Sequence, residues 1–365
     1  MSDVRTADRG YIREVNLRAV VETLRRLGAM TRAGIARETG LSGPTVSAVV
    51  TTLTEAGVVT PVGEGPATGG RRGDLYELNA GSRTVLAVDL SGEPARHALV
   101  DLNGGIVAGS LHAVPATALR SPATFVRWLA KQASRLEHVI GIGLAVPGVT
   151  DPLTGTIEWA PSLGWRDVRL LDEVRATVPT EVVVVDNDLN LAALGEHAFG
   201  EHDSSDLVMF GVRGGLGAGL ILGGALHRGV HFAAGEIGYL PAPSGVRGSR
   251  DFGPLETTLF DHMRAIGEGA AADLASAAEM AGIAEILTSA CLAVAAVLDV
   301  GVIVLGEEIL RYGRRLDEEL TGRLADVLPH PPTVIPSRLG ADATLRGAAA
   351  AVHQQVNTDV RRLLI

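Results

Sequence analysis

Apolar and polar side chains alternate with helical spacing through the first part of the chain. Apolar residues recur over 12–27, which predicts a first helix that ends near Gly28. Its expected inner face consists of Ile12, Val15, Val20, Leu24 and Leu27. Thr31 can cap a second, short helix that ends near Gly40, because its hydroxyl oxygen can accept a hydrogen bond from a first-turn N–H.

A third helix and a hairpin follow. Ser42 can cap this helix, and its inner face is expected to consist of Val46, Val50 and Leu53. Two apolar runs, 58–62 and 75–78, predict strands on either side of a glycine-rich turn. Three helices followed by a β-hairpin predict a winged helix-turn-helix over residues 1–80, with Gly40–Ser42 as the turn between its second and third helices.

From Thr84 onward, strand patterns alternate with helical ones. Strands are expected at 85–89, 98–101, 106–107, 139–146, 181–186, 207–210, 219–222 and 302–305. Helices are expected at 122–136 and 189–199, as a pair spanning 270–298, and from Ala343 to the end. This alternation predicts an α/β body behind the N-terminal head.

Composition narrows the class of protein. The 365 residues are 46% hydrophobic and 20% charged, which indicates a folded chain of two or three domains. The net charge is −10, which argues against a general nucleic-acid coat. Residues 1–80 carry ten Arg and nine acidic residues, so the head is near +1 and the rest near −11. A near-neutral head on an acidic body favours local, specific DNA contact.

Cysteine usage and hydropathy exclude other classes. Cys291 is the single cysteine, so neither an intrachain disulfide nor a thiolate metal cluster is expected. No apolar run follows the first charged residues, and the longest apolar stretches are broken by Gly or charge. We therefore expect a cytoplasmic protein without a membrane partner.

The third helix is expected to enter the major groove of a double-stranded DNA operator. The groove-facing positions are Gly43, Thr45, Ser47, Ala48 and Thr51, all small residues suited to close approach, thymine methyls and hydroxyl hydrogen bonds. The capping residue Ser42 is a further candidate for DNA contact. No Arg or Lys occurs from Gly43 to Thr54, so Arg32 and Arg37 on the preceding helix are expected to contact phosphates.

Arg71 and Arg72 follow two glycines at the tip of the predicted wing. Flexible glycines would let this pair of guanidinium groups reach a narrow minor groove. A solvated wing is the alternative for these two residues. The alternative for the whole head is a three-helix cap that only mediates dimerisation.

A set of short motifs along the chain resembles one known family. In the head these are Arg13–Asn16, Thr31–Ala36, Gly40–Ser42, Thr45–Ser47 and Gly70–Arg72. In the body they are Val88–Leu90, Leu99–Gly104, Gly141–Gly148, Ala160–Trp165, Asn187–Asp188, Gly235–Gly238 and Val304–Gly306. Each motif is weak alone, but the ordered set resembles the ROK family of repressors and sugar kinases.

This resemblance implies an actin-like (ribonuclease H-like) body of two α/β lobes with a sugar cleft between them. The small lobe would comprise residues 81–188 and 343–365, and the large lobe, residues 189–342, would mediate dimerisation. A homodimer or tetramer is the expected assembly.

The resemblance also implies an effector site. Asp188 occupies the position of the carboxylate that removes the sugar hydroxyl proton in the family's kinases. Asn187, Glu236 and Glu256 match positions that hydrogen-bond sugar hydroxyls, and Tyr239 replaces a family His that contacts the sugar. The alternative is that residues 186–188 only cap the following helix; capping and sugar binding can coexist.

Positions that handle phosphate and zinc in the family are altered here. Glu93 and Arg213 interrupt the two phosphate loops, so neither kinase activity nor ATP binding is expected. Tyr239 holds the place of a zinc-binding His, and Arg247, Ser249 and Pro254 hold those of cysteines, so no zinc and no other cofactor is expected. Ser162 replaces a family Asn, which leaves the effector's identity open.

These inferences describe a DNA-binding transcriptional regulator, a repressor of carbohydrate or related metabolism, whose body binds a sugar or sugar derivative. One alternative is a ROK sugar kinase with an attached DNA-binding domain. A second is a regulator without a small-molecule effector that responds to a protein partner.

Overall fold

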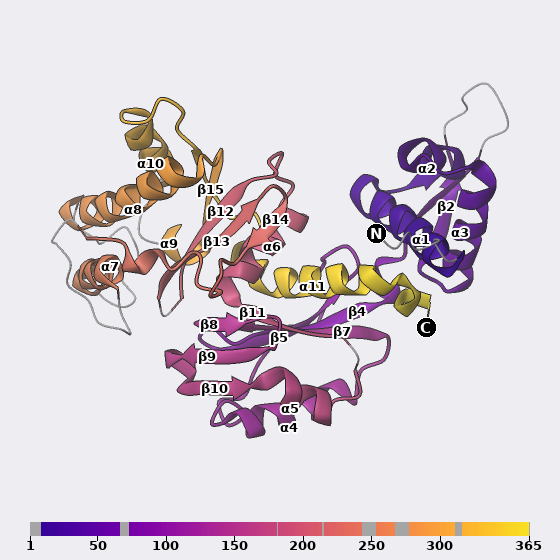
Figure 1. Ribbon diagram of the computed structural model, residues 1–365, viewed down its shortest axis with the longest axis horizontal. Coiled ribbons are helices and arrows are strands. Elements are labelled where there is room, and N and C mark those ends of the chain that lie inside the picture. The colour runs from indigo at the N-terminus through magenta and orange to yellow at the C-terminus, as the bar shows by residue number, and fades with distance from the viewer. Residues whose placement is uncertain are drawn as a thin grey trace, which may run out of the picture.

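The computed structural model describes residues 9–65, 73–180, 182–213, 215–242, 253–266, 277–310 and 316–364. Figure 1 shows a small N-terminal head beside a body of two lobes, with one long helix running through the middle of the molecule. The α/β body and its N-terminal head were both expected from the sequence, and both are confirmed.

The head is a winged helix-turn-helix. Its helices are α1 (Arg9–Leu27), α2 (Arg32–Thr39) and α3 (Gly43–Glu55). The wing consists of β2 (Val59–Glu64) and β3 (Asp74–Leu78), and β1 (Met30–Thr31), which was not predicted, joins it in the order β1-β3-β2. The Thr31 and Ser42 side chains cap α2 and α3 by accepting from the Gly34 and Thr45 amides, as expected.

The core of the head matches the predicted helix faces only in part. Val46, Val50 and Leu53 are fully buried, as expected. On α1 the predicted Val20 and Leu24 are buried together with Leu17 and Val21, whereas Ile12, Val15 and Leu27 are 42–49% exposed. The two ends of α1 extend past the small core of the head, so the apolar spacing overestimated how much of this helix is covered.

The first body sheet has the order β11-β7-β4-β5-β6. Its strands are β4 (Thr84–Asp89), β5 (Arg96–Asp101), β6 (His112–Ala113), β7 (Val139–Val146) and β11 (Val183–Asn187). Helices α4 (Pro122–Ala133) and α5 (Leu170–Thr177) cover one face, while α11 (Ala343–Val356) covers the other (Figure 1). The predicted strand at 106–107 was wrong: it is only a bridge between Val100 and Ile106.

A small three-stranded sheet, which the apolar pattern did not predict, extends from the first lobe. It contains β8 (Val149–Asp151), β9 (Thr156–Ala160) and β10 (Trp165–Arg169), with the 3-10 helix η2 (Pro161–Leu163) between the last two.

The second body sheet has the order β14-β13-β12-β15-β16. Its strands are β12 (Leu207–Val212), β13 (Leu216–Leu222), β14 (Ala225–His227), β15 (Val302–Leu305) and β16 (Thr333–Pro336). The helices of this lobe are α7 (Pro254–Ile266), α8 (Ala277–Leu298), α9 (Glu307–Leu310) and α10 (Leu316–Ala325). Of the pair predicted at 270–298, residues 277–298 form one helix, α8, and residues 270–276 lie outside the described residues; α7 lies earlier in the chain.

Helix α8 has an unusually apolar composition. Within the described ranges it is the one helix long and apolar enough to cross a membrane by composition alone, over Ala281–Leu298. Ile283, Leu287 and Cys291 are nevertheless at most 1% exposed, inside the core of the second lobe. Its apolar face therefore packs within the protein, and burial raises the pKa of the Cys291 thiol to about 12.

Helices α6 (Asp188–Phe199) and α11 lie against each other between the two sheets. Glycine allows this close approach: a Cβ atom at Gly347 would lie 1.6 Å from the Leu191 carbonyl oxygen, and one at Gly195 would lie 2.3 Å from that of Ala343. The two lobes therefore share a tightly packed pair of helices, and any larger side chain at these glycines would separate them.

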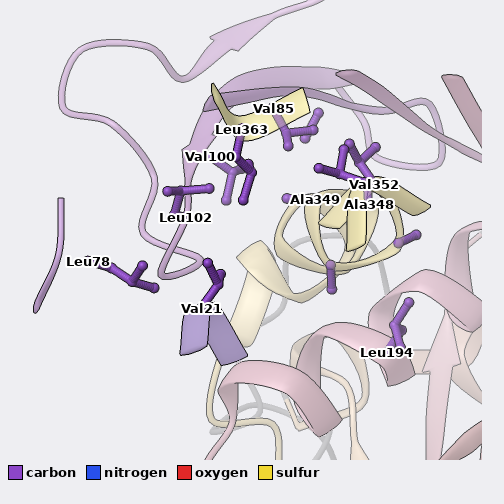
Figure 2. Close-up of a cluster of buried hydrophobic side chains, with 14 of the residues drawn as sticks. Val21, Leu78, Val85, Val100, Leu102, Leu194, Ala348, Ala349, Val352 and Leu363 are labelled. Carbon is purple, nitrogen blue, oxygen red and sulfur yellow. The ribbon is translucent and has the colours of Figure 1, made fainter. Parts of the chain in front are cut away.

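The head is packed onto the body through an apolar contact, which we call the head–body seam (Val21, Leu78, Leu102 and Leu363). These side chains belong to one continuous buried cluster, and Figure 2 shows them between α1, β3 and the C-terminal segment. That segment is the 3-10 helix η6 (Asn357–Leu364), which contacts α1. Arg25 Nε on α1 also donates to the Leu102 carbonyl oxygen, 3.0 Å away.

Candidate functional site

A cavity of about 310 Å³ lies between the two lobes, where strands of both sheets end. The five residues predicted to bind an effector all line it: Asn187, Asp188, Glu236, Tyr239 and Glu256. They come from β11, the first turn of α6, the segment after β14 and the first turn of α7. Ser162 and Trp159 border the same cavity from the small sheet of the first lobe.

Asn187 is committed largely to holding the backbone. Its Oδ1 accepts hydrogen bonds from the amides of Leu189 (2.9 Å) and Asn190 (3.0 Å), which caps α6. Its Nδ2 donates to the Gly148 carbonyl oxygen at 3.0 Å. Asn187 therefore caps α6, and its amide group keeps one hydrogen that a ligand could accept.

Asp188 is the most perturbed acid of the cavity. It is 3% exposed, and burial raises the pKa of its carboxyl to about 7. The charge of Arg213 opposes that rise, while the charge of Asp89 adds to it. The carboxyl is thus suited to exchange a proton near neutral pH.

Glu256 and Glu236 form a second acidic group. Glu256 accepts from the Leu216 amide (3.0 Å) and the Gly253 amide (3.2 Å), which fixes its carboxylate. Burial raises the pKa of Glu256, and these two hydrogen bonds oppose the rise. The side chain of Glu236 keeps access to solvent, but neighbouring protein atoms displace part of the water around its carboxyl group, and this partial desolvation raises its pKa. The negative charge of Glu256 adds to the rise. Tyr239, 49% exposed, lies at the edge of the cavity.

Arg213 joins the lobes behind the cavity. Its Nε donates to Glu308 Oε1 at 2.8 Å, and its Nη1 donates to Asp89 Oδ2 at 3.2 Å and to the hydroxyl of Thr344. The guanidinium is 6% exposed, and Asp89 and Thr344 are fully buried. Burial acts to lower the pKa of Arg213, but the charges of the Asp89, Glu308 and Asp188 carboxylates raise it by more than burial lowers it. The pKa is therefore raised overall, and the guanidinium stays charged. Sequence reasoning noted this Arg only as a departure from the family loop.

A second ion pair, between Asp186 and Arg228, also crosses between the lobes. Arg228 donates from Nε (2.9 Å) and Nη2 (2.6 Å) to Asp186 Oδ2. Asp186 Oδ1 accepts from the Asn187 amide at 2.8 Å. Asp186 was considered only as a helix cap in the sequence, and the acidic run gave no indication of its partner 42 residues away.

The predicted DNA-contacting residues gather around the turn of the head. Arg32, Arg37, Ala48, Thr51 and Ser42 are exposed, whereas Thr45 and Ser47 are half-buried. The Arg32 guanidinium lies 4.8 Å from the centroid of the Tyr76 ring, which orients it beside the wing. The Ser42 and Thr45 hydroxyls share a hydrogen bond of 2.7 Å. Arg71 and Arg72 lie outside the described residues.

Of the positions that matched the family's zinc site, Tyr239 and Pro254 are described, while Arg247 and Ser249 lie outside the described residues. Across the described ranges, no group of three or more His, Cys, Asp or Glu side chains is arranged to hold a metal ion.

Comparison with known proteins shows which family and which relatives this chain resembles. Residues 85–255 match the model of the ROK family. A putative xylose repressor from Caldicellulosiruptor sp. is 32% identical over 238 residues, covering 63% of this chain and 59% of that protein. The chain therefore matches about three fifths of the length of this curated relative.

Solved structures extend the likeness to the whole fold. A ROK family transcriptional regulator, a homologue of the E. coli MLC protein, superposes with a TM-score of 0.77 at 21% identity, covering 97% of this chain and 99% of that one. A ROK family glucokinase from Streptomyces griseus, solved with glucose and AMPPNP, superposes with a TM-score of 0.59 at 24% identity, covering 74% and 99%. The first of these structures spans nearly the whole of this chain and the second about three quarters of it. Residues 85–255 form a ROK family domain.

Proposed function

We propose that this chain is a sequence-specific DNA-binding transcriptional regulator, a repressor of carbohydrate or related metabolism, whose body binds a sugar-type effector. One observation carries the proposal: the five polar residues Asn187, Asp188, Glu236, Tyr239 and Glu256 line a single cavity in a body packed against a winged helix-turn-helix. The name of the relative, a putative xylose repressor, supports it.

Three units divide this work in the proposal. Residues 1–80 bind an operator, residues 81–188 with 343–365 form the small lobe, and residues 189–342 form the large lobe and the dimerisation surface. The active form is a homodimer or tetramer in the cytoplasm, because two heads are needed to read two half-sites of an operator.

The head is proposed to read DNA with α3 in the major groove. Ala48 and Thr51 present small exposed side chains there, and the Ser42, Thr45 and Ser47 hydroxyls supply hydrogen bonds. Arg32 and Arg37 are the proposed phosphate contacts. Arg71 and Arg72 are proposed for the adjacent minor groove from their sequence alone.

Effector control is proposed to work through lobe closure. A ligand in the cavity contacts both lobes, so it stabilises one relative arrangement of them over the other. The head is packed to the body through an apolar seam, so a change in lobe arrangement changes the spacing of the two heads in a dimer.

The test begins with operator sequences selected from random duplex DNA by the full chain. Arg32→Ala should weaken operator binding and lower the salt-dependence slope by about 1, because one phosphate contact is lost. Arg175→Ala, at an exposed position of α5 in the body, is the matched control and should change neither. Equal effects of the two substitutions would contradict the proposed DNA surface.

Effector response is tested separately. Asp188→Ala should keep operator binding but abolish release by the inducing sugar, because the cavity loses an acceptor without any change in the head. A variant that responds to sugar normally would show that the cavity is not the sensing site.

A second candidate, a sugar kinase, is favoured by the raised pKa of Asp188, which suits a general base near neutral pH. Against it, Asp89 in the first phosphate loop is buried and already accepts from Ser91 and Arg213, so its carboxylate is not available to a nucleotide-bound metal. We propose that the chain uses neither ATP nor zinc and is not an enzyme. Sugar-dependent ADP release by the purified chain would reverse this conclusion.

A third candidate, control by a protein partner, rests on Tyr239 being exposed at the edge of the cavity. Thermal-shift measurements against a sugar panel separate it from the favoured function, because a protein-controlled regulator would show no stabilisation by any sugar.

A further inference from the structure

The cavity carries an unusual balance of charge. Three carboxylates line it, on Asp188, Glu236 and Glu256, whereas Arg213 supplies the one cationic side chain among the described lining residues. Burial raises the pKa of Asp188 and of Glu256, and the atoms packed around Glu236 raise its pKa although its side chain keeps access to solvent. Carboxyl groups thus outnumber cationic side chains by three to one among the described lining residues.

The single guanidinium is not available to balance a ligand's charge. Arg213 donates to the carboxylates of Glu308 and Asp89 at 2.8 and 3.2 Å, and neither of these lines the cavity. The Arg213 guanidinium is thus already paired with Glu308 and with Asp89, which also lies 3.8 Å from Arg96 Nη2, before any ligand arrives. Arg213 acts on the cavity wall as a structural connector and not as an anion receptor.

Backbone groups that commonly bind anions are occupied as well. The free N–H groups at a helix N-terminus are a common anion site, but the Leu189 and Asn190 amides of α6 donate to Asn187. The Leu216 amide beside the cavity donates to Glu256, and so does the Gly253 amide at the start of α7. The protein's own acceptors therefore fill these donor groups.

The remaining chemistry suits hydroxyl donors. Carboxylates accept hydrogen bonds from hydroxyl groups without a charge penalty, and fixed acceptors such as Glu256 give directional contacts. A volume of about 310 Å³ lies at the small end of ligand pockets, which run from roughly 300 to 1,000 Å³. A single sugar ring fits these properties better than an oligosaccharide.

We infer that the cavity selects uncharged monosaccharide-sized polyols and rejects their phosphorylated and acidic counterparts. This inference rests on the proposed sugar-binding function and adds the charge class of the ligand. The distinction determines which metabolic signal the regulator reads: the free sugar before a kinase acts on it, and not the sugar phosphate that results.

The experiment is titration calorimetry of the full chain at pH 8 with xylose, glucose and N-acetylglucosamine, and then with glucose 6-phosphate, N-acetylglucosamine 6-phosphate and glucuronate. For the sugar that binds, the charged counterpart should bind at least 100-fold more weakly. A 6-O-methyl derivative serves as the size control and should lose less affinity than the phosphate. A charged sugar that binds as tightly as the neutral one would overturn the inference while leaving the sugar-binding function intact.

Two variants locate the charge effect. Glu236→Gln should reduce the ratio of the affinities for the neutral and the phosphorylated sugar by roughly tenfold, because it removes one negative charge from the lining. Glu285→Gln, at an exposed position of α8 outside the lining, should leave the ratio unchanged. An unchanged ratio in both variants would overturn the inference. Failure of every sugar to bind would overturn the proposed function itself, and the inference with it.

Discussion

The cleft between the lobes and the head–body seam both join parts of the molecule, but the cleft has several polar and charged side chains in its lining, whereas the seam consists of apolar ones. The cleft is hollow and polar, and ion pairs at Arg213 and Arg228 cross it. The seam is filled with apolar side chains, among them Val21, Leu102 and Leu363, each at most 1% exposed (Figure 2).

This difference assigns a different mechanical property to each junction. A polar cavity with unfilled volume can form new contacts with both lobes when a ligand enters. A close-packed apolar contact resists such change and transmits displacement instead. Helix α11 connects the two junctions: Thr344 in its first turn binds Arg213, and η6 after its end contacts the head. Movement is therefore expected to begin at the cleft and to pass through the seam.

The largest expected effect is at the cleft. Arg213→Met keeps much of the side-chain volume but removes the guanidinium that pairs with Glu308 and Asp89, and it leaves buried Asp89 with the more distant Arg96 at 3.8 Å, so the free energy of unfolding should fall by about 3–5 kcal/mol. Arg323→Met breaks the exposed pair with Glu319 and is the control, with an expected loss of about 0.3–0.5 kcal/mol. Urea denaturation measures both, and similar losses would mean that Arg213 is not a buried connector.

The next effect tests the seam. Leu102→Ala should lower the free energy of unfolding by about 2–5 kcal/mol, because the side chain is fully buried between head and body. Leu153→Ala, 81% exposed in the turn after β8, should change it by less than about 0.5 kcal/mol. In Leu102→Ala the head should also become separable from the body by limited proteolysis. Stable, protease-resistant protein would show that the seam is not closely packed.

The two junctions should also respond to pH with opposite sign. At the cleft, the raised pKa of Asp188, about 7, means that the folded state keeps a proton that the unfolded chain has released above pH 4, so stability falls as pH rises from 4 to 7. Near the seam, burial and, second to it, the charge of Arg25 together lower the pKa of His353 to about 3. Only the unfolded chain binds that proton below pH 6.5, so stability falls as pH drops toward 3.

Urea midpoints of Asp188→Asn and His353→Leu against the wild type, measured from pH 5 to pH 8, check this contrast. The stability of Asp188→Asn relative to wild type should grow by about 1–2 kcal/mol from pH 5 to pH 7, since each pH unit contributes at most about 1.4 kcal/mol. His353→Leu should gain relative to wild type in the other direction, toward pH 5. Parallel curves for either variant would refute the assignment of that group.

The local pattern of the sequence predicts interactions between residues that are close along the chain, and it does not predict those between residues that are far apart. Ser42 caps α3 through residues three positions away, so the head could be read directly from its sequence. The family motifs likewise predicted the five residues that meet in the cavity. Arg213 and Asp89 lie 124 positions apart and Arg25 and Leu102 lie 77 apart, so no local pattern could reveal either pair. The short strands β8–β10 were missed because their few apolar residues give little alternation.

The smallest expected effect concerns the polar rim of the seam. Asn357 Nδ2 donates to Glu22 Oε1 at 3.2 Å, and this bond joins η6 to the head at an exposed position. If apolar packing holds the seam, water can replace this bond, and Asn357→Ala should lower the free energy of unfolding by no more than about 0.5 kcal/mol. Operator binding and its release by sugar should both persist. A loss comparable with that of Leu102→Ala would mean that the hydrogen bond, and not the apolar contact, fixes the head, and the contrast between the two junctions would then fail.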